Sequence, residues 1–288
     1  MSLDSRTLPA ALAAAPPPLM QNGHLRMKRC RYGLMLYSAF DTYIGRSFDL
    51  YGEFAEAEIA IFRQLVRPGQ CVFDVGANIG AHTIALAAIV GPHGRVTSFE
   101  PQRVIFQMLN ANVALNGLHH VTTHQMALGS AAGSLKVPPL DYAGELNFGG
   151  LSLEHIKQGE EVRQSTFDSL AVRACDFVKI DVEGMEIEVL KGMAETIQRF
   201  RPAMYVENDR RHKSAALVGH LLGLGYRLYY HVSAVFPATN FFANPVNVFG
   251  AAGAFNMICL PGERSHSAGG LREITHPNEA LMGPRHEG

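Results

Sequence analysis

Cys71-Val72-Phe73-Asp74-Val75-Gly76-Ala77-Asn78-Ile79-Gly80 is the stretch that decides the fold class. Its first half is typical of a buried strand, its second half is a glycine-rich turn, and an apolar helical pattern over residues 79–90 follows. Such a turn lets a ligand approach the backbone and directs the helix N-terminus at it. The spacing is D-x-G-x-N-x-G, and asparagine is the non-glycine residue type that best tolerates a positive φ. The acid before the glycines would repel a pyrophosphate and suits a ligand with an ammonium group.

Short apolar runs alternate with helical patterns through the rest of the chain. Strands that alternate with helices in this way predict right-handed βαβ units and a mostly parallel sheet with helices on both faces. We therefore predict a doubly wound, Rossmann-like α/β fold. The further predicted strands are residues 95–100, 121–126, 176–181, 203–207, 226–231 and 255–260, and the further helices include residues 104–113, 190–197 and 214–224.

Composition excludes several other classes of protein. The 288 residues carry 25 Lys+Arg against 26 Asp+Glu without a basic run, so nucleic acid is not expected as the main partner. Apolar runs end well before the ~20 residues that cross a bilayer, and residues 8–19 make a poor signal peptide. The four cysteines are far apart, which predicts a reducing, cytoplasmic location and no zinc site. Residues 1–22 and 262–288 are predicted to be poorly ordered tails, and an oligomer is possible.

Acidic residues stand at the ends of four predicted strands, where α/β sheets bind ligands. These are Asp74, Glu100, Asp181 and the run that starts at Glu207. Glu100 lies 20 residues past Gly80, where an acid can accept both hydroxyls of a ribose. A nucleoside that carries a cation in place of phosphates satisfies both features, and S-adenosylmethionine is such a ligand.

Four motifs, in order and spacing, resemble the FkbM family of S-adenosylmethionine-dependent methyltransferases. They are Val72-Phe73-Asp74-Val75-Gly76-Ala77-Asn78-Ile79-Gly80, Phe99-Glu100-Pro101, Ser165-Thr166-Phe167-Asp168-Ser169-Leu170, and Lys179-Ile180-Asp181-Val182-Glu183-Gly184 with Glu186 and Leu190-Lys191-Gly192. The resemblance covers roughly residues 51–207. It implies a class I methyltransferase fold with a seven-stranded sheet, and O-methylation of hydroxyls on sugars, polyketides or other secondary metabolites. We expect residues 23–50 to form an N-terminal extension and residues 51–261 to form the methyltransferase domain.

The resemblance also suggests cofactor-binding residues. The segment with Glu53 and Glu58 resembles one that closes over the methionine end of the cofactor, and Asp74 or Glu53 is expected to face the ammonium group. Ala127 would leave a flat slot for adenine. His82 and Thr83 are further candidates for cofactor binding. In the alternative interpretation Thr83 only caps the helix and His82 is only exposed on its surface. The full predicted set is Glu53, Glu58, Asp74, Gly76, Ala77, Asn78, Gly80, His82, Thr83, Glu100, Pro101, Ala127 and Asp181.

Methyl transfer is an in-line displacement at an activated carbon, so the enzyme mainly aligns the nucleophile and removes its proton. Asp181 and Glu183, at the end of one strand, are the leading candidates for contact with the acceptor hydroxyl. The alternative is that they only stabilise a helix N-terminus. His231, at the end of a later strand, is a second candidate base.

A metal site is the alternative to a protein base. Asp181, Glu207 and Asn208 resemble the oxygen ligands that hold Mg²⁺ in catechol-type O-methyltransferases. Neighbouring parallel strands often carry acids without metal, so we predict no metal and keep Mg²⁺ as the alternative.

Two loops could recognise the acceptor. Residues 231–254 combine aromatic and amide side chains, and residues 138–159 are rich in glycine; a hydrophobic lid or a dimer contact is the alternative for the first. We predict a methyltransferase acting on a hydroxyl of a sugar, glycan or other small intermediate. A nicotinamide oxidoreductase would need the absent G-x-G-x-x-G, and a non-catalytic cofactor-binding subunit of a glycan-assembly complex is the remaining alternative.

Overall fold

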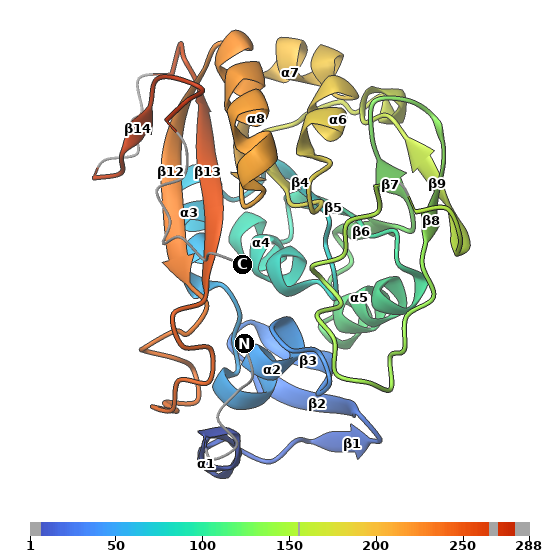
Figure 1. The fold of residues 1–288 in the computed structure, drawn as a ribbon, viewed down its shortest axis with the longest axis vertical. Coiled ribbons are helices and arrows are strands. Elements are labelled where there is room, and N and C mark those ends of the chain that lie inside the picture. The colour runs from blue at the N-terminus through green and yellow to red at the C-terminus, as the bar shows by residue number, and fades with distance from the viewer. Residues whose placement is uncertain (1–6, 155, 265–269, 280–288) are drawn as a thin grey trace.

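A central eight-stranded sheet organises the computed structural model, which describes residues 7–154, 156–264 and 270–279 (Figure 1). The strand order is β14-β12-β13-β11-β10-β4-β5-β6. The strands from β11 to β6 pair in parallel, and β13 runs antiparallel between β11 and β12. The bounds are β4 (Cys71–Val75), β5 (Arg95–Phe99), β6 (Val121–His124), β10 (Phe177–Ile180), β11 (Ala203–Glu207), β12 (Tyr226–Ala234), β13 (Gly253–Pro261) and β14 (Glu273–Ile274). The predicted doubly wound fold is confirmed, and the seven expected strands gain the short edge strand β14.

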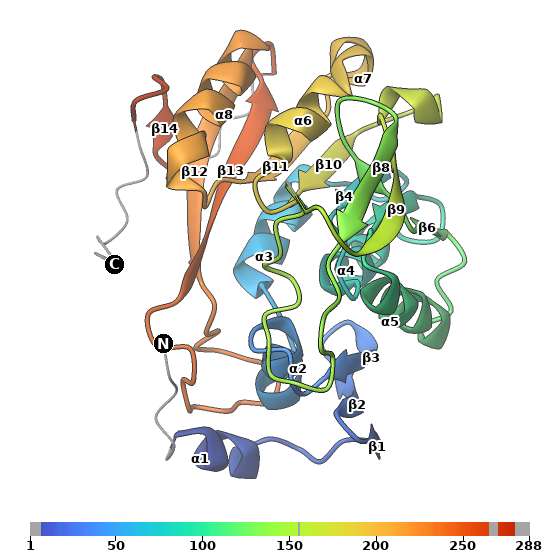
Figure 2. The ribbon, with the colours of Figure 1, turned by 45° about the vertical axis from the view of Figure 1, so that its right-hand side comes forward.

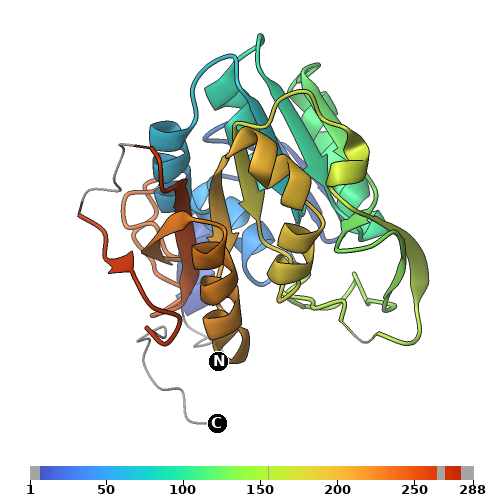
Figure 3. The same ribbon diagram turned by 90° about the horizontal axis from the view of Figure 1, so that it is seen from above.

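Helices cover both faces of this sheet, as the view from above shows (Figure 3). One face packs against α3 (Glu56–Leu65), α4 (Ala81–Val90) and α5 (Arg103–Leu115), and the other against α6 (Glu186–Lys191), α7 (Ala194–Phe200) and α8 (Arg211–Gly223). Side chains of β4 point to both faces of the sheet. Val72 belongs to the same apolar cluster as Phe62 of α3, whereas Val75 belongs to the cluster that contains Leu190 of α6. Both faces of the sheet are thereby buried against apolar helix residues.

The single helix predicted through residues 190–197 is wrong. The chain forms α6 and α7 with a break at Gly192 and Met193. The Asp168 carboxylate explains the break, because it accepts hydrogen bonds from the backbone N–H of Glu195 and Thr196 at 3.0 and 2.9 Å and so caps a new helix.

An N-terminal unit lies below the sheet in Figure 1. It comprises α1 (Thr7–Ala14), the antiparallel strands β1 (Met20–Asn22), β2 (Leu25–Cys30) and β3 (Gly33–Ser38), and α2 (Ile44–Tyr51). Where composition predicts an unstructured tail to residue 22, the structure has a helix and a strand; residues 1–6 lie outside the described residues. Asn244 holds α1, since its amide donates to the backbone carbonyls of Ala11 and Leu50 at 2.9 and 3.0 Å.

Two asparagines of α5 pair with the edge of β3. Asn112 accepts a hydrogen bond from the Leu36 N–H at 2.6 Å and donates to the Leu36 carbonyl at 3.0 Å. Asn116 does the same with Leu34, at 2.8 Å in both directions. Each amide side chain thus makes the pair of hydrogen bonds that a neighbouring strand residue would make. The free backbone N–H and C=O groups at this edge of the small sheet are therefore paired with side chains of a helix.

A second small sheet, ordered β7-β9-β8, follows β6. It contains β7 (Ala127–Leu128), β8 (Gly133–Val137) and β9 (Glu160–Ser165), and the 3-10 helix η1 (Asp168–Leu170) comes next. At the other end of the chain β14 pairs with β12 inside the predicted C-terminal tail, while residues 265–269 and 280–288 lie outside the described residues. Within the described ranges, we find no helix long and apolar enough to cross a membrane.

Candidate active site

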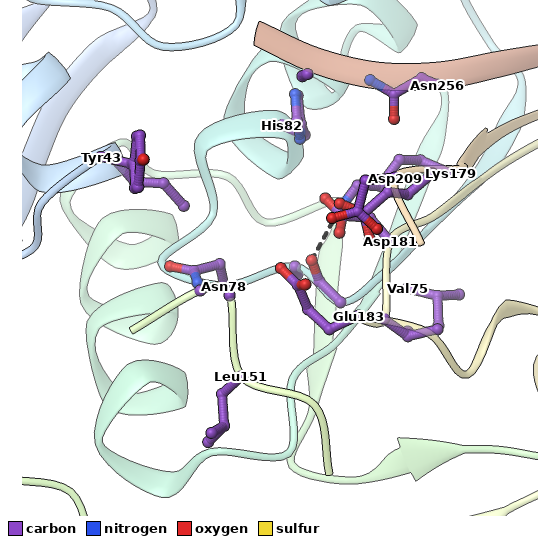
Figure 4. A pocket seen from close by; sticks show the side chains of 18 of the residues that line it. Tyr43, Val75, Asn78, His82, Leu151, Lys179, Asp181, Glu183, Asp209 and Asn256 are labelled. Carbon is purple, nitrogen blue, oxygen red and sulfur yellow. Dashed lines mark hydrogen bonds and ion pairs between the residues drawn. The ribbon is translucent and has the colours of Figure 1, made fainter. Parts of the chain in front are cut away.

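A cavity of about 980 Å³ opens at the carboxyl ends of β4, β5, β10 and β11, where sheets of this kind bind ligands. Figure 4 shows Asn78 and Leu151 on one side of it and Asp181, Glu183 and Asp209 gathered on the other. The predicted site residues that line it are Glu58, Gly76, Ala77, Asn78, His82, Glu100, Pro101, Ala127, Asp181, Glu183 and Glu207. The lining does not include Glu53, Asp74, Gly80, Thr83, Asn208 or His231, all of which are described residues.

The turn after β4 has the shape that its sequence predicts. Gly76 has φ 79° and Asn78 has φ 50°, and the N–H groups of Gly76 and Ala77 both donate to the Phe99 carbonyl at 3.0 and 2.9 Å. A Cβ on Gly76 would lie 1.8 Å from the backbone oxygen of Asp181, so no side chain fits there. Glycine at this position lets the turn pack directly against the end of β10, and the turn residues Gly76, Ala77 and Asn78 line the cavity.

Glu100 projects from the end of β5 and is 4% exposed. Its two carboxylate oxygens accept hydrogen bonds from the N–H groups of Asn78 and Gln102, at 2.9 and 2.8 Å. Burial raises the pKa of Glu100 to about 7, although these two hydrogen bonds act to lower it. Each oxygen keeps acceptor capacity toward the cavity, which is what paired ribose hydroxyls require.

Asp74 does not face the cavity, contrary to expectation. Its side chain is fully buried and accepts a hydrogen bond from the Thr83 hydroxyl at 2.7 Å. Lys179 of β10 lies beside it, with Nζ 3.2 Å from the Asp74 carboxylate, 3.3 Å from that of Asp181 and 2.7 Å from the Gly76 carbonyl. Burial lowers the pKa of Lys179, but the two carboxylates more than offset this and raise it. Asp74 and Thr83 thus hold the lysine that supports the turn.

Lys179 was missed among the predicted site residues, although it lines the cavity. The available signal was a charged residue in the middle of the apolar run 177–180, since a lysine in a buried parallel strand requires a partner.

Glu53 also fails to reach the cavity. Its carboxylate pairs with Arg31 at 2.6 Å and accepts the Phe241 N–H at 2.8 Å. Burial raises the pKa of Glu53, which the hydrogen bond and charge of Arg31 oppose. A carboxylate already neutralised by a guanidinium is a structural tie between the N-terminal unit and the β12–β13 connection. Gly80 is likewise structural, because it has φ 92° and a Cβ there would meet Leu109 of α5.

Glu58 and His82 form a buried pair on the cavity wall. The Glu58 carboxylate lies 3.2 Å from His82 Nε2, and its other oxygen accepts the Asn256 amide at 3.2 Å. The His82 ring packs against Phe54 and Phe62. His82 is therefore buried, not exposed as the alternative interpretation had it.

Carboxylates gather at the ends of β10 and β11. Arg210 forms ion pairs with the carboxylates of Glu183 and Asp209, and Lys179 forms one with Asp181. Burial, reinforced by the charge of Asp181, raises the pKa of Glu183 to about 8 against the opposing effect of Arg210. Burial also raises the pKa of Glu207 well above its usual range, and its Oε2 has no hydrogen-bond partner among the described residues. Asp181, Glu183, Glu207 and Asp209 form what we call the acidic wall of the cavity, and these four carboxyl groups outnumber the two cations that contact them in the described part of the chain, Lys179 and Arg210.

Three of these carboxylates, Asp181, Glu183 and Glu207, each place one oxygen within 4.8 Å of the others, a spacing that could hold a metal ion. The trio differs from the predicted one, because Asn208 is buried beside Met257 and donates to its sulfur at 3.4 Å. Two of the three acids already have a cation of this chain as partner.

His231 is not part of the site. Its Nδ1 bonds to the Tyr205 hydroxyl at 2.7 Å inside the sheet, and burial lowers its pKa. The predicted strand 226–231 continues to Ala234, so His231 lies within β12 and not at its end. The predicted strand end is therefore wrong, and His231 does not line the cavity.

The two predicted acceptor loops differ in outcome. The first loop, residues 231–254, lines the cavity only through the two ends of the loop, Val232–Val235 and Ala251–Ala254. The phenylalanines of this loop do not line the cavity. Phe236, for example, packs against Tyr51. The second loop does reach the cavity, through Asn147, Gly149, Gly150, Leu151 and Leu153.

Comparison with known proteins agrees with this geometry. The model of the methyltransferase FkbM domain matches residues 74–228, which include the glycine-rich turn, Glu100 and the acidic wall. The chain belongs to the FkbM methyltransferase family. For the matched domain this confirms the predicted class, S-adenosylmethionine-dependent methyltransferase, over a nicotinamide oxidoreductase.

Relatives of this FkbM chain include two curated proteins. Hexuronic acid methyltransferase AglP of Haloferax volcanii is 31% identical over 160 residues, covering 54% of this chain and 62% of the relative. Methyltransferase sdnD of Sordaria araneosa is 29% identical over 160 residues, covering 43% and 60%. The chain thus spans about three fifths of the length of each. The crystal structure of a methyltransferase FkbM from Methylobacillus flagellatus is 18% identical, with a TM-score of 0.45 and coverage of 88% of this chain and 59% of that one.

Proposed function

We propose that this protein transfers the methyl group of S-adenosylmethionine to a hydroxyl group of a sugar, glycan or similar small biosynthetic intermediate. The observation that carries the proposal is that one continuous cavity is lined by Gly76 and Glu100 and also by the acidic wall. The relative AglP, named as a hexuronic acid methyltransferase, supports a carbohydrate acceptor.

The chain fits the cofactor in two places. The turn residues Gly76, Ala77 and Asn78 line the cavity, and Glu100 offers two carboxylate oxygens with free acceptor capacity. We propose that Gly76, Ala77 and Asn78 hold the methionine side, Glu100 and Pro101 the ribose, and Ala127 the adenine. When bound, the cofactor supplies an activated methyl group as the electrophile.

The chain's own part in the reaction is to place the acceptor and take its proton. We propose that Asp181 and Glu183 contact the acceptor hydroxyl, because both line the cavity at the strand ends. Burial and the charge of Asp181 raise the pKa of Glu183, so its carboxylate is a stronger proton acceptor than an exposed one. Lys179 and Arg210 hold the two carboxylates in place.

Mg²⁺ remains the second candidate for activating the hydroxyl, on the observation that Asp181, Glu183 and Glu207 converge. We propose that transfer is independent of metal, since Lys179 and Arg210 already form ion pairs with two of the three acids, Asp181 and Glu183. Turnover that is unchanged by EDTA and by added Mg²⁺ is the expected result, and loss of turnover in EDTA with recovery in Mg²⁺ would contradict it.

The decisive experiment follows a labelled methyl group. Protein and S-adenosylmethionine carrying a tritiated methyl are incubated with extracts of the source organism, and the labelled product is identified. A labelled carbohydrate or other hydroxyl-bearing small molecule supports the proposal. Label that appears on amines, on RNA or nowhere, while S-adenosylhomocysteine still raises the Tm, would overturn it.

A further inference from the structure

We propose that Tyr43 is the stacking platform on which the ring of a carbohydrate acceptor lies, and that it determines acceptor specificity. This inference rests on the proposed function. Tyr43 lies outside the matched residues 74–228, yet its side chain lines the cavity and is 38% exposed. Figure 4 places it across the cavity from Asp181 and Asp209.

The ring of Tyr43 is supported from behind. It stacks on Phe249 with centroids 5.9 Å apart and an interplanar angle of 13°. Phe249 is itself buried and also contacts Tyr51 of α2. One face of Tyr43 is thus covered by a rigid aromatic neighbour, and the exposed part of the ring is left to the cavity.

The backbone of Tyr43 is fixed as firmly as its ring. The buried Asp41 carboxylate accepts hydrogen bonds from the N–H groups of Tyr43 and Ile44, both at 2.9 Å. Thr42 donates to the Leu146 carbonyl at 3.1 Å, which ties this turn to the loop that lines the cavity from residue 147. A platform that is ordered before the ligand arrives costs little entropy on binding.

Tyr43 lies on the side of the cavity opposite the acidic wall. Glu100 and Ala127 follow β5 and β6, at one edge of the sheet, whereas Phe249 belongs to the connection between β12 and β13, toward the other edge. Figure 2 shows this connection reaching α2, whose N-terminus carries Tyr43. The proposal therefore places the acceptor ring between Tyr43 on one side of the cavity and Asp181 on the other.

The surrounding chemistry is that of a carbohydrate site. The C–H bonds of a pyranose carry partial positive charge and meet the negative face of an aromatic ring. The hydroxyls of an acceptor in this cavity would find amide and carboxylate groups, since Asn147, Asn256 and Glu183 also line it. A cavity that combines an aromatic face with amide and carboxylate groups matches a sugar better than a flat hydrocarbon.

A tryptophan reporter tests the platform directly, because the chain contains no tryptophan. Tyr43→Trp places the sole indole on the platform, and Phe241→Trp is the matched control, since Phe241 is 45% exposed but does not line the cavity. With S-adenosylhomocysteine present, methyl glycosides of glucuronic acid and glucose are titrated to about 100 mM, which covers millimolar dissociation constants. Sorbitol, an open-chain polyol, is the control ligand.

We expect a saturable change in emission for Tyr43→Trp with a glycoside, and none with sorbitol or for Phe241→Trp. Absence of that change, or an equal one in Phe241→Trp, would overturn the platform. In transfer assays Tyr43→Ala should raise the acceptor KM about five- to tenfold, and Tyr43→Phe should restore it. A tenfold loss of S-adenosylhomocysteine affinity in Tyr43→Ala would also overturn it, because the ring would then serve the cofactor.

The two proposals fail separately. A glycoside that binds to Tyr43→Trp but receives no methyl group refutes the proposed acceptor and leaves the platform standing. Transfer to a carbohydrate with an unchanged KM in Tyr43→Ala refutes the platform and leaves the function standing.

Discussion

Replacing Lys179 with methionine removes the cation beneath the glycine-rich turn. The Lys179 side chain is 3% exposed, and its ammonium lies 3.2 Å from Asp74, whose side chain is fully buried. Without it, Asp74 keeps the Thr83 hydroxyl but no opposite charge. Removal of one partner from a buried pair costs about 3–5 kcal/mol. At roughly 2 °C per kcal/mol for a chain of this size, the Tm falls by about 6–10 °C.

Urea unfolding followed by far-UV circular dichroism measures this loss. Lys136→Met is the matched control, because Lys136 forms an exposed pair with Glu161 at 2.9 Å and its loss costs under about 1 kcal/mol. The double variant Asp74→Asn/Lys179→Met should regain about 1–3 kcal/mol relative to Lys179→Met, since no unpaired charge is left buried. The reasoning would be refuted if the free energy of unfolding of Lys179→Met lay within about 1 kcal/mol of that of the natural protein, or if the double variant were no more stable than Lys179→Met.

Three further predictions concern the site. Gly76→Ala should weaken S-adenosylhomocysteine binding at least about 100-fold by calorimetry, because its Cβ would lie 1.8 Å from the Asp181 oxygen; Gly91→Ala, also at positive φ but with open space, is the control and should bind normally. The Glu100 carboxyl, with its pKa raised to about 7 by burial, is ionised above that pH, so affinity should fall about tenfold from pH 8 to pH 6, and Glu100→Gln should flatten this profile. His231→Asn should keep kcat/KM within about threefold while lowering the Tm, because the ring bonds inside the sheet; a hundredfold loss of kcat/KM would restore His231 as the base.

Local pattern was sufficient for the main strands and for the turn. Residues 71–80 specify their own conformation, because an apolar run forms a buried strand and glycine or asparagine accepts the positive φ that follows. The place of Glu100 follows from the parallel pairing of β4 with β5, which brings consecutive strand ends together.

Partners distant in sequence could not be predicted. An acid in the sequence carries no mark of whether its charge is free for a ligand, and Asp74 and Glu53 are neutralised by Lys179 and Arg31. Tyr43 gives no periodic signal either, since its place in the cavity depends on packing with Phe249 some 200 residues later. Long-range contacts of this kind decide which of several plausible residues face the ligand.

The pairing of Asn112 and Asn116 with β3 has a consequence for cooperativity. Local opening of the N-terminal sheet would strip four hydrogen bonds from the amides of α5 as well as from the strand. The backbone amides of Leu34 and Leu36 should therefore exchange with deuterium as slowly as those of the catalytic core, although they lie outside the matched domain. The N-terminal sheet and α5 are therefore expected to open together, as one cooperative unit.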